Sequence, residues 1–277
     1  MIRSNAETLI RSNIARFVDD ELVPRAHDID ARGEFPMEMF QKIGKMGVFG
    51  IRYPKNKGGS GGNTTLFCII CEEIARGLMS MGAITAMQCL MGTNFLFHYG
   101  TDEMREKYFL PAMSGEKIAC FALTESGAGS DVAAIASSAR RERDGYLLNG
   151  EKMWISLATK AQHALVVARC LQGQADPHDE LVALLVELDS PGVSRGDIHG
   201  KLGVRAGSTG WLAFQDVRIP AENRLGEEGE GFKIAMSCLD NGRYTVAAGA
   251  TGLIRASLEA SVRYANDRRA FGREIGK

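Results

Sequence analysis

Two short segments combine side chains that suit the binding of a small polar ligand. The first, residues 120–132, reads CFALTESGAGSDV. Gly127 and Gly129 allow the backbone to approach a ligand closely, while the hydroxyls of Thr124 and Ser130 can donate hydrogen bonds to carbonyl or phosphate oxygens. A Rossmann fingerprint needs a third glycine and a following helix, which this segment lacks. On these residues alone, a capped glycine turn explains the segment equally well.

The second segment, residues 152–156, reads KMWIS. In a strand, Trp154 and Ser156 lie on the same face, because side chains alternate with a period of two. An aromatic plane and a hydroxyl on one face can flank a flat ligand with hydrogen-bonding edges. The competing interpretation is a tryptophan buried in the core of a β domain. The local sequence leaves both interpretations open.

Other reactive side chains form no recognisable centre in the sequence. Cys68 and Cys71 are three residues apart in an apolar helical pattern. No second Cys or His pair follows at zinc spacing, so we predict two core cysteines. The five histidines are dispersed along the chain, which gives no support to a metal site or to a Ser-His-Asp triad. We therefore predict no metal.

The patterning that must position these segments changes twice along the chain. Apolar residues recur every three or four positions from Ser4 to about Ser114, which predicts helices interrupted by a glycine-rich loop at 54–65. From Ile118 the period becomes two, and Asn149-Gly150 favours a type I′ hairpin turn. The predicted strands include residues 145–148, 165–168, 181–186 and 211–217.

A helical period returns at Gly231 and continues for roughly 35 residues. Its small residues, Ala247–Ala250 and Gly252, form a smooth face that permits close helix packing. We expect partners for this helix from a further helical region or from another subunit. Its apolar stripe is predicted to be Phe232, Met236, Leu239, Val246, Ala250, Leu253, Leu258, Val262 and Ala265.

Together these patterns predict an α+β multidomain chain. We expect an all-α domain over residues 1–115 and an antiparallel β-sandwich or barrel over residues 116–226. Residues 227–277 are predicted to start a C-terminal helical bundle. The two candidate ligand-binding segments, 120–132 and 152–156, then lie at the ends of strands in the β domain.

The composition excludes several classes of protein. Hydrophobic residues make up 45% of the 277 residues and charged residues 24%, which is typical of a globular protein and not of a disordered one. The net charge of -1 provides no field for nucleic acid. The sequence has no apolar run of roughly 18 residues that would insert into a membrane, and no secretory signal. With six cysteines in apolar surroundings, we expect reduced thiols and a cytoplasmic location, or the mitochondrial matrix in a eukaryote.

The order of several motifs resembles the acyl-CoA dehydrogenase family. After the helical region, the chain carries ALTESGAGSD, LNGEKMWIS, KLGVRAGST, FQDVRIP, LGEEGEGF and RRAFG in the family's own order. The resemblance implies a helical N-terminal domain, a β middle domain and a C-terminal four-helix domain. It also implies bound FAD, an acyl-CoA thioester substrate and an external acceptor such as electron-transfer flavoprotein.

Carried over residue by residue, the resemblance assigns the flavin ring to the two segments above. Main-chain groups of Leu123 and the hydroxyl of Thr124 would bind its polar edge, and Trp154 would cover one face. The implied cofactor residues are Phe121, Ala122, Leu123, Thr124, Gly129, Ser130, Trp154, Ile155, Ser156, Arg268 and Phe271. The implied substrate residues are Ser130, Asp240 and Arg243. Many members carry Thr where this chain has Ser156, and both residues provide a hydroxyl.

Asp240 and Arg243 are three residues apart and therefore lie on one helix face. An exposed ion pair between them is the alternative interpretation.

Two of the implied cofactor residues, Arg268 and Phe271, cannot reach the same flavin as the others. On one continuous helix, Asp240 and Arg268 are about 42 Å apart at 1.5 Å per residue. The resemblance implies that Arg268 and Phe271 reach the FAD of a neighbouring subunit, so we expect a homodimer or homotetramer.

The family reaction also needs a carboxylate base, which the sequence does not reveal. Most members use a Glu in the C-terminal domain, so we expect this Glu beyond Lys277; a minority use the position that is Gly242 here. Glu125 lies among turn residues, and Asp240 would be held at low pKa by Arg243. Two explanations stay open: a chain that lacks most of the C-terminal domain, or a naturally short, non-catalytic subunit of a hetero-oligomeric dehydrogenase.

The sequence leaves other questions of function open as well. The main alternative from another enzyme class is a flavin monooxygenase or oxidase on the same fold. Acyl chain length and the identity of the electron acceptor are not readable from these residues.

Overall fold

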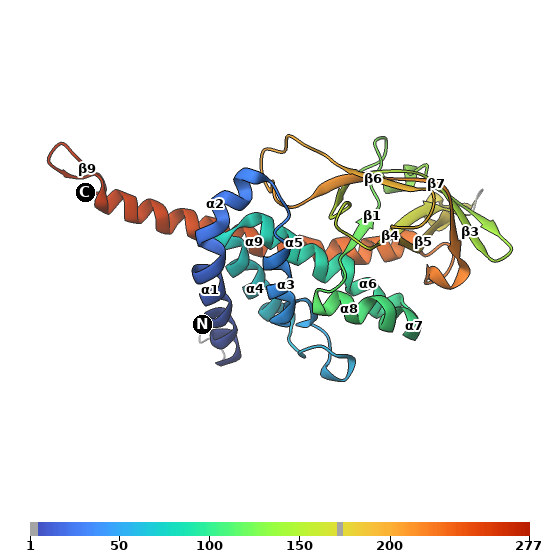
Figure 1. Ribbon diagram of the computed structural model, residues 1–277, viewed down its shortest axis with the longest axis horizontal. Coiled ribbons are helices and arrows are strands. Elements are labelled where there is room, and N and C mark those ends of the chain that lie inside the picture. The colour runs from blue at the N-terminus through green and yellow to red at the C-terminus, as the bar shows by residue number, and fades with distance from the viewer. Residues whose placement is uncertain (1–4, 171–173) are drawn as a thin grey trace.

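The computed structural model describes residues 5–170 and 174–277 and places a helical region, a sheet and one long helix in chain order (Figure 1). The helices are α1 (Asn5–Phe17), α2 (Val23–Arg32), α3 (Met37–Lys45), α4 (Thr64–Gly77), α5 (Met79–Met87), α6 (Asn94–Tyr99), α7 (Asp102–Met104), α8 (Leu110–Ser114) and α9 (Gly231–Asp267). The strands are β1 (Ala119–Ala122), β2 (Ser138–Glu142), β3 (Gly145–Ser156), β4 (His163–Arg169), β5 (Leu181–Glu187), β6 (Val193–Asp197), β7 (Thr209–Pro220), β8 (Arg224–Leu225), β9 (Arg269–Ala270) and β10 (Arg273–Glu274). The predicted domain boundaries fall between α8 and β1 and between β8 and α9.

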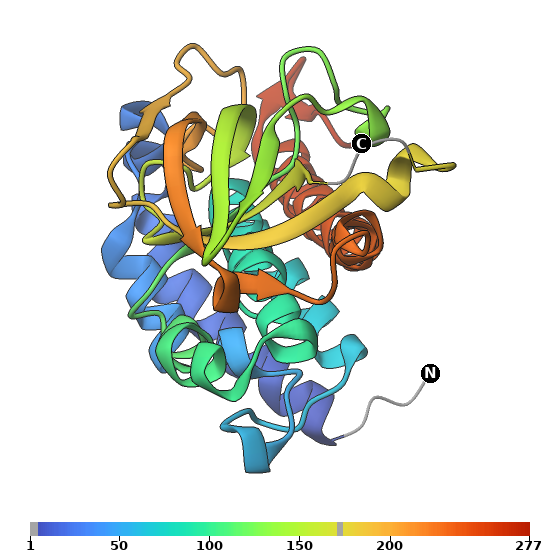
Figure 2. The same ribbon diagram turned by 90° about the vertical axis from the view of Figure 1, so that its right-hand side faces the viewer.

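Local signals explain where several helices begin and end. The Asn63 side chain caps α4 by accepting a hydrogen bond from the backbone N–H of Leu66, and Thr101 caps α7 in the same way. Gly33 ends α2 in the left-handed conformation that glycine adopts without strain. The predicted loop at 54–65 is confirmed up to Asn63, apart from one 3₁₀ turn. The helices of this region pack against each other beneath the sheet (Figure 2).

The middle region forms one eight-stranded sheet in the order β6-β7-β3-β2-β4-β5-β8, with β1 also paired to β4. The described pairs are antiparallel, except that β1 runs parallel to β4 and a single parallel pair joins β2 to β4. The predicted strands all lie within β3, β4, β5 and β7. The prediction of a mainly antiparallel β domain is confirmed.

The predicted hairpin turn at Asn149-Gly150 is wrong. β3 runs through both residues, and the turn between β2 and β3 lies just before Gly145, which pairs with Glu142. The ladder with β7 shifts register between Leu148 and Gly150, so the two residues form an irregularity inside the strand. Gly150 is required there because its φ is +134° and a Cβ atom would lie 2.4 Å from the Ser137 hydroxyl.

The long helix predicted from Gly231 is confirmed as α9, which has 37 residues. Its buried face differs from the predicted stripe and consists of Gly231, Ile234, Ala235, Cys238, Thr245, Gly249 and Gly252. A Cβ atom on Gly252 would lie 2.0 Å from the carbonyl oxygen of Glu72 on α4, so the glycines of the smooth face pack within the chain, while Ala247 and Ala250 are exposed. The predicted stripe is right only at its start, where Phe232, Met236 and Leu239 are partly buried against the core. Its later members Val246, Leu253, Leu258 and Val262 are exposed, because close backbone approach at the glycines makes the contact there instead.

Beyond Arg255, whose guanidinium forms ion pairs with Glu72 and Glu73 on α4, the helix α9 leaves the body of the molecule. Figure 1 shows this end projecting past the other elements, with β9 at its tip and the sheet at the opposite end of the molecule. The large apolar side chains Leu253, Ile254, Leu258 and Val262 of α9 are exposed. The β9–β10 hairpin at its tip follows no pattern that we recognised in the sequence.

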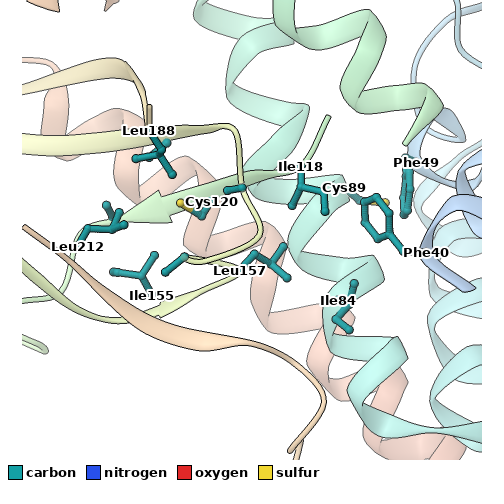
Figure 3. Packing of buried hydrophobic residues seen from close by; sticks show 14 of the residues in the cluster. Phe40, Phe49, Ile84, Cys89, Ile118, Cys120, Ile155, Leu157, Leu188 and Leu212 are labelled. Atoms are coloured by element: carbon teal, nitrogen blue, oxygen red, sulfur yellow. The ribbon is translucent and has the colours of Figure 1, made fainter. Parts of the chain in front are cut away.

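A continuous apolar core joins the helices to the sheet. Figure 3 shows it running from Phe40 and Phe49 through Cys89 and Ile118 to Ile155 and other residues of the sheet. All six cysteines are free. On α4, Cys71 is buried as predicted, whereas Cys68, also predicted as a core cysteine, is only partly buried. In the part of the chain that the structure describes, no group of three or more His, Cys, Asp or Glu side chains could hold a metal ion. None of the described helices has the length and apolar character needed to cross a bilayer.

Candidate cofactor site

A small cavity brings the two chemistry-bearing segments together. Leu123 and Thr124, which follow β1, line it beside Trp154 and Ser156, which end β3. The cavity has a volume of about 140 Å³. Its remaining lining residues are Met87, Met91, Phe121, Ile155 and Leu239. We call Leu123, Thr124, Trp154 and Ser156 the cofactor wall.

A β-bulge aims Trp154 outward. Lys152 pairs with Leu212 and Ile155 with Gly210, so Met153 and Trp154 on β3 oppose Trp211 alone on β7. Trp154 has a φ of 61°, in the left-handed region that an aromatic residue rarely adopts. Its side chain is 60% exposed, so the core-tryptophan interpretation is wrong. Bulges commonly occur next to functional sites, where they redirect a side chain.

Polar contacts join the two strands of the wall. The backbone N–H of Met153 donates to the carbonyl oxygen of Thr124 at 2.9 Å. The buried Lys152 ammonium donates to the carbonyl oxygen of Leu123 at 3.0 Å and to Glu125 Oε1 at 2.7 Å. Because β1 pairs with β4 and β3 pairs with β2 and β7, these three bonds take the place of a ladder between the strands.

Glu125 is held as a carboxylate and is therefore a poor base. Burial opposes its ionisation, but hydrogen bonds from Lys152 and from the backbone N–H groups of Ala136 and Ser137 outweigh this effect and lower its pKa. Burial lowers the pKa of Lys152 to about 8, against the opposing effect of Glu125. Lys152 is still mainly protonated at neutral pH.

The glycine segment that follows Glu125 is open to a ligand. Glu125 and Ala128 exchange two backbone hydrogen bonds and form a tight turn. Gly127, Gly129 and Ser130 are exposed, and a Cβ atom on either glycine would meet nothing within 4 Å. The chain itself does not require glycine there, so the free space is available to a bound group.

The other predicted residues fall in three places. Ala122 is fully buried in the core, so only its main chain is available to a cofactor. Asp240 and Arg243 are exposed on α9 one turn from the cavity residue Leu239. The predicted alternative of an Asp240–Arg243 ion pair is wrong, since the described residues show no such pair, and each side chain is free to meet a ligand.

Arg268 and Phe271 lie apart from the wall. Arg268 follows the last turn of α9 and is exposed, and Phe271 is fully exposed in the β9–β10 hairpin. Figure 1 places this hairpin at the end of the molecule opposite the sheet. Within one chain the structure therefore does not bring these two residues to the cavity.

The cavity residues fit part of a flat, largely apolar ring system with polar edges. A cavity of about 150 Å³ holds one benzene ring, and the exposed indole of Trp154 extends the surface beyond the enclosed part. The Thr124 and Ser156 hydroxyls can meet polar ring atoms, and among the described residues no charged side chain lines the cavity. This donor set is consistent with the isoalloxazine of the expected FAD.

Sequence reasoning missed several residues of this site. Lys152 reads as one more polar residue of KMWIS, and only its contacts with Leu123 and Glu125 reveal its place behind the wall. Met87 and Met91 look like core methionines in the sequence. Leu239 could have been found, because it directly precedes Asp240 on the same helix.

Comparison with known proteins identifies the family of the chain. Three family models match the chain: the acyl-CoA dehydrogenase N-terminal domain over residues 4–116, the middle domain over 120–217 and the C-terminal domain over 229–277. The probable acyl-CoA dehydrogenase YngJ of Bacillus subtilis is 37% identical, covering 97% of this chain and 70% of its own length. The mitochondrial short-chain specific acyl-CoA dehydrogenase of Rattus norvegicus is 38% identical over 97% of this chain, which spans 65% of that relative. The structure of butyryl-CoA dehydrogenase from Megasphaera elsdenii superposes with a TM-score of 0.95 at 31% identity, covering all of this chain and 73% of that one. The chain belongs to the acyl-CoA dehydrogenase family.

Proposed function

We propose that this protein catalyses the FAD-dependent α,β-dehydrogenation of an acyl-CoA thioester and passes the electrons to an external acceptor. The observation that carries the proposal is the shared cavity of Thr124 and Trp154, which brings the family's two flavin segments together at one site. Family membership supplies the reaction class.

The residues of the wall have distinct roles in this proposal. When bound, FAD supplies the acceptor for the hydride that leaves the β carbon. The hydroxyl of Thr124 and the main chain of Leu123 hold the polar edge of the ring, while Trp154 covers one face and excludes water from it. Ile155 and Ser156 complete this side, and Phe121 lines the adjoining part of the cavity.

The exposed polar residues suit the phosphate-bearing arm of CoA. Ser130 offers a hydroxyl next to the open glycine turn, and Arg243 offers a guanidinium that matches phosphate geometry. Asp240 provides an acceptor on the same helix face. All three are exposed, as binding to a long ligand across the surface requires.

The general base is not among the residues that line the cavity. Proton removal next to a thioester needs a carboxylate in a dry pocket with its pKa raised toward neutrality. Glu125 has a lowered pKa instead, Asp240 is exposed, and position 242 is a glycine that leaves open space toward Leu90. We propose that the base is a Glu that follows Lys277 in the C-terminal helical domain.

A second copy of the chain completes the site in this proposal. Arg268 and Phe271 are too far along α9 to reach their own wall, so they are assigned to the FAD of a neighbouring subunit in a homodimer or homotetramer. The exposed apolar residues Leu253, Leu258 and Val262 support contacts along the same part of α9.

The proposed acceptor is electron-transfer flavoprotein or a similar carrier. The proposed location is the cytoplasm, or the mitochondrial matrix in a eukaryote. The six free cysteines support a reducing compartment.

A flavin reduction assay tests the proposed activity. The protein purified with FAD is mixed without oxygen with a panel of acyl-CoA thioesters, and the visible flavin absorbance is followed. We expect bleaching by at least one thioester and slow return of the absorbance in air. Bleaching only by an external reductant followed by rapid reaction with oxygen indicates a monooxygenase or oxidase instead. Bound FAD that no thioester bleaches points to a non-catalytic subunit.

A further inference from the structure

A buried ion pair sits behind the cofactor wall without lining its cavity. The side chain of Lys152 is fully buried, and that of Glu125 is only 10% exposed. Their oppositely charged atoms are 2.7 Å apart. Charged groups are rarely buried so completely unless they are paired, so this position calls for an explanation.

The pair spans a break in the sheet. β1 is aligned by β4, and β3 is aligned by β2 and β7. Among the described strand pairs, none joins β1 to β3, so the two sides of the wall are set by separate ladders. Lys152 crosses this break by donating to Leu123 as well as to Glu125.

The carboxylate of Glu125 connects the pair to the segment that precedes β2. It accepts hydrogen bonds from the backbone N–H groups of Ala136 at 2.7 Å and Ser137 at 3.0 Å, just before β2. Lys152 is therefore attached to two segments at once, the end of β1 and the approach to β2. Loss of the carboxylate leaves two backbone donors and one buried ammonium without their partner.

The pair acts directly next to the bulge. Lys152 is the last regularly paired residue of β3 before Met153 and Trp154, and Met153 donates to the carbonyl oxygen of Thr124. Trp154 adopts a strained left-handed conformation, which persists only where the surroundings determine it. The contacts of Lys152 and Met153 with β1 are the surroundings that the structure provides.

We propose that Lys152 and Glu125 form a positioning pair that sets the separation and orientation of the Thr124 hydroxyl and the Trp154 indole, and thereby determines how FAD is held. This inference rests on the proposed function of the wall. The pair touches neither cofactor nor substrate and acts through Thr124 and Trp154.

The test uses Glu125→Gln, which keeps the side-chain shape, and Lys152→Met, which keeps an unbranched side chain one atom shorter; each removes one charge. Glu73→Gln is the matched control, because the Glu73 side chain is 3% exposed and forms ion pairs with Arg76 and Arg255 away from the cavity. Each protein is labelled with 5-fluorotryptophan, and Trp211→Phe assigns the two fluorine resonances, since the chain has only Trp154 and Trp211. The FAD-free spectrum reports on Trp154 without requiring any cofactor.

We expect the Trp154 resonance of both wall variants to move or split by more than its wild-type line width, while Glu73→Gln leaves it in place. We also expect the dissociation constant for FAD to rise at least tenfold in both variants and less than twofold in the control. Because the two residues act as one unit, the double variant should bind FAD no more weakly than the weaker single variant.

Folded wall variants with an unchanged Trp154 resonance and unchanged FAD affinity would overturn the inference. If Lys152→Met does not fold, the same measurements on Glu125→Gln decide the matter. If the wild-type protein takes up no FAD, the proposed function fails, whereas the FAD-free fluorine spectra still decide whether the pair positions Trp154.

Discussion

The cofactor wall and the distal end of α9 both carry residues that we propose to bind FAD, but the chain holds them in opposite ways. Thr124 and Trp154 are set by a bulge, a buried ion pair and backbone hydrogen bonds within one chain. Arg268 and Phe271 sit on an exposed hairpin at the end of a helix that has left the body of the molecule. We define the distal end as residues 256–277.

The difference separates two kinds of site residue. The wall is held by contacts within one chain, so its properties are measurable in an isolated chain. In our proposal the distal end depends on a second copy for its role, since its side chains lie away from the wall of their own chain. Changes in the wall should therefore alter the chain itself, and changes at the distal end should alter only cofactor binding in the assembly.

The largest expected effect is a pH dependence caused by Lys152. Burial lowers its folded-state pKa to about 8 from the ordinary 10.5. Between these values the unfolded chain binds the proton and the folded chain does not, so stability rises with pH. Relative to Lys152→Met, the wild-type free energy of unfolding should rise by up to about 3 kcal/mol from pH 7.5 to 10.5. Urea unfolding of both proteins measures it, and a difference that stays flat or falls with pH contradicts the burial of a charged Lys152.

The next largest effect tests the close backbone contact between α9 and α4 at Gly252. Gly252→Ala places a Cβ atom 2.0 Å from the carbonyl oxygen of Glu72, so we expect a loss of about 2 kcal/mol from the free energy of unfolding. Gly242→Ala is the control, since its Cβ atom meets only Leu90 at 3.9 Å and should gain up to about 1 kcal/mol of helix propensity. Equal effects of both substitutions in urea unfolding are not compatible with the close contact of α4 and α9.

The distal end gives a smaller effect that appears only in binding. Arg268→Ala should weaken FAD binding about tenfold, or roughly 1.4 kcal/mol, through loss of a charge-assisted contact in the assembly. Its free energy of unfolding should stay within about 0.5 kcal/mol of wild type, because the side chain is exposed. Calorimetric titration with FAD provides the measurement. Unchanged affinity would place Arg268 outside the cofactor site of either subunit.

The smallest effect tests the strain at Trp154. At a φ of 61° an alanine is strained and a glycine is not, so Trp154→Gly should be more stable than Trp154→Ala by about 1 kcal/mol. At the exposed Glu151, in the same strand, the order should reverse, because glycine costs more than alanine in an ordinary strand position. Thermal unfolding of the four variants checks this, and the ordinary order at both positions would show that the bulge is relaxed.

The same comparison shows what the sequence can and cannot reveal. The change of period at Ile118 and the helix from Gly231 are repeated local patterns, and the structure confirms both. The placement of Thr124 near Trp154 followed from the motifs. The Lys152–Glu125 pair did not, because it joins residues 27 apart across a break in strand pairing that no local pattern marks.

Errors arose where local signals compete with long-range pairing. Asn149-Gly150 has the residues of a hairpin turn, but pairing of β3 with both β2 and β7 keeps the strand continuous and uses the glycine for close approach to Ser137. On α9, the larger side chains of the predicted stripe are partly or fully exposed, because the glycines allow the backbone itself to make the contact.

The most direct measurement is a titration of the 5-fluorotryptophan-labelled protein with FAD. A flavin ring stacked against the wall should shift the Trp154 resonance strongly and to saturation at one FAD per chain, while Trp211, on the strand opposite the bulge, should shift much less. Saturable FAD binding that leaves the Trp154 resonance unchanged would contradict the placement of the flavin between Thr124 and Trp154.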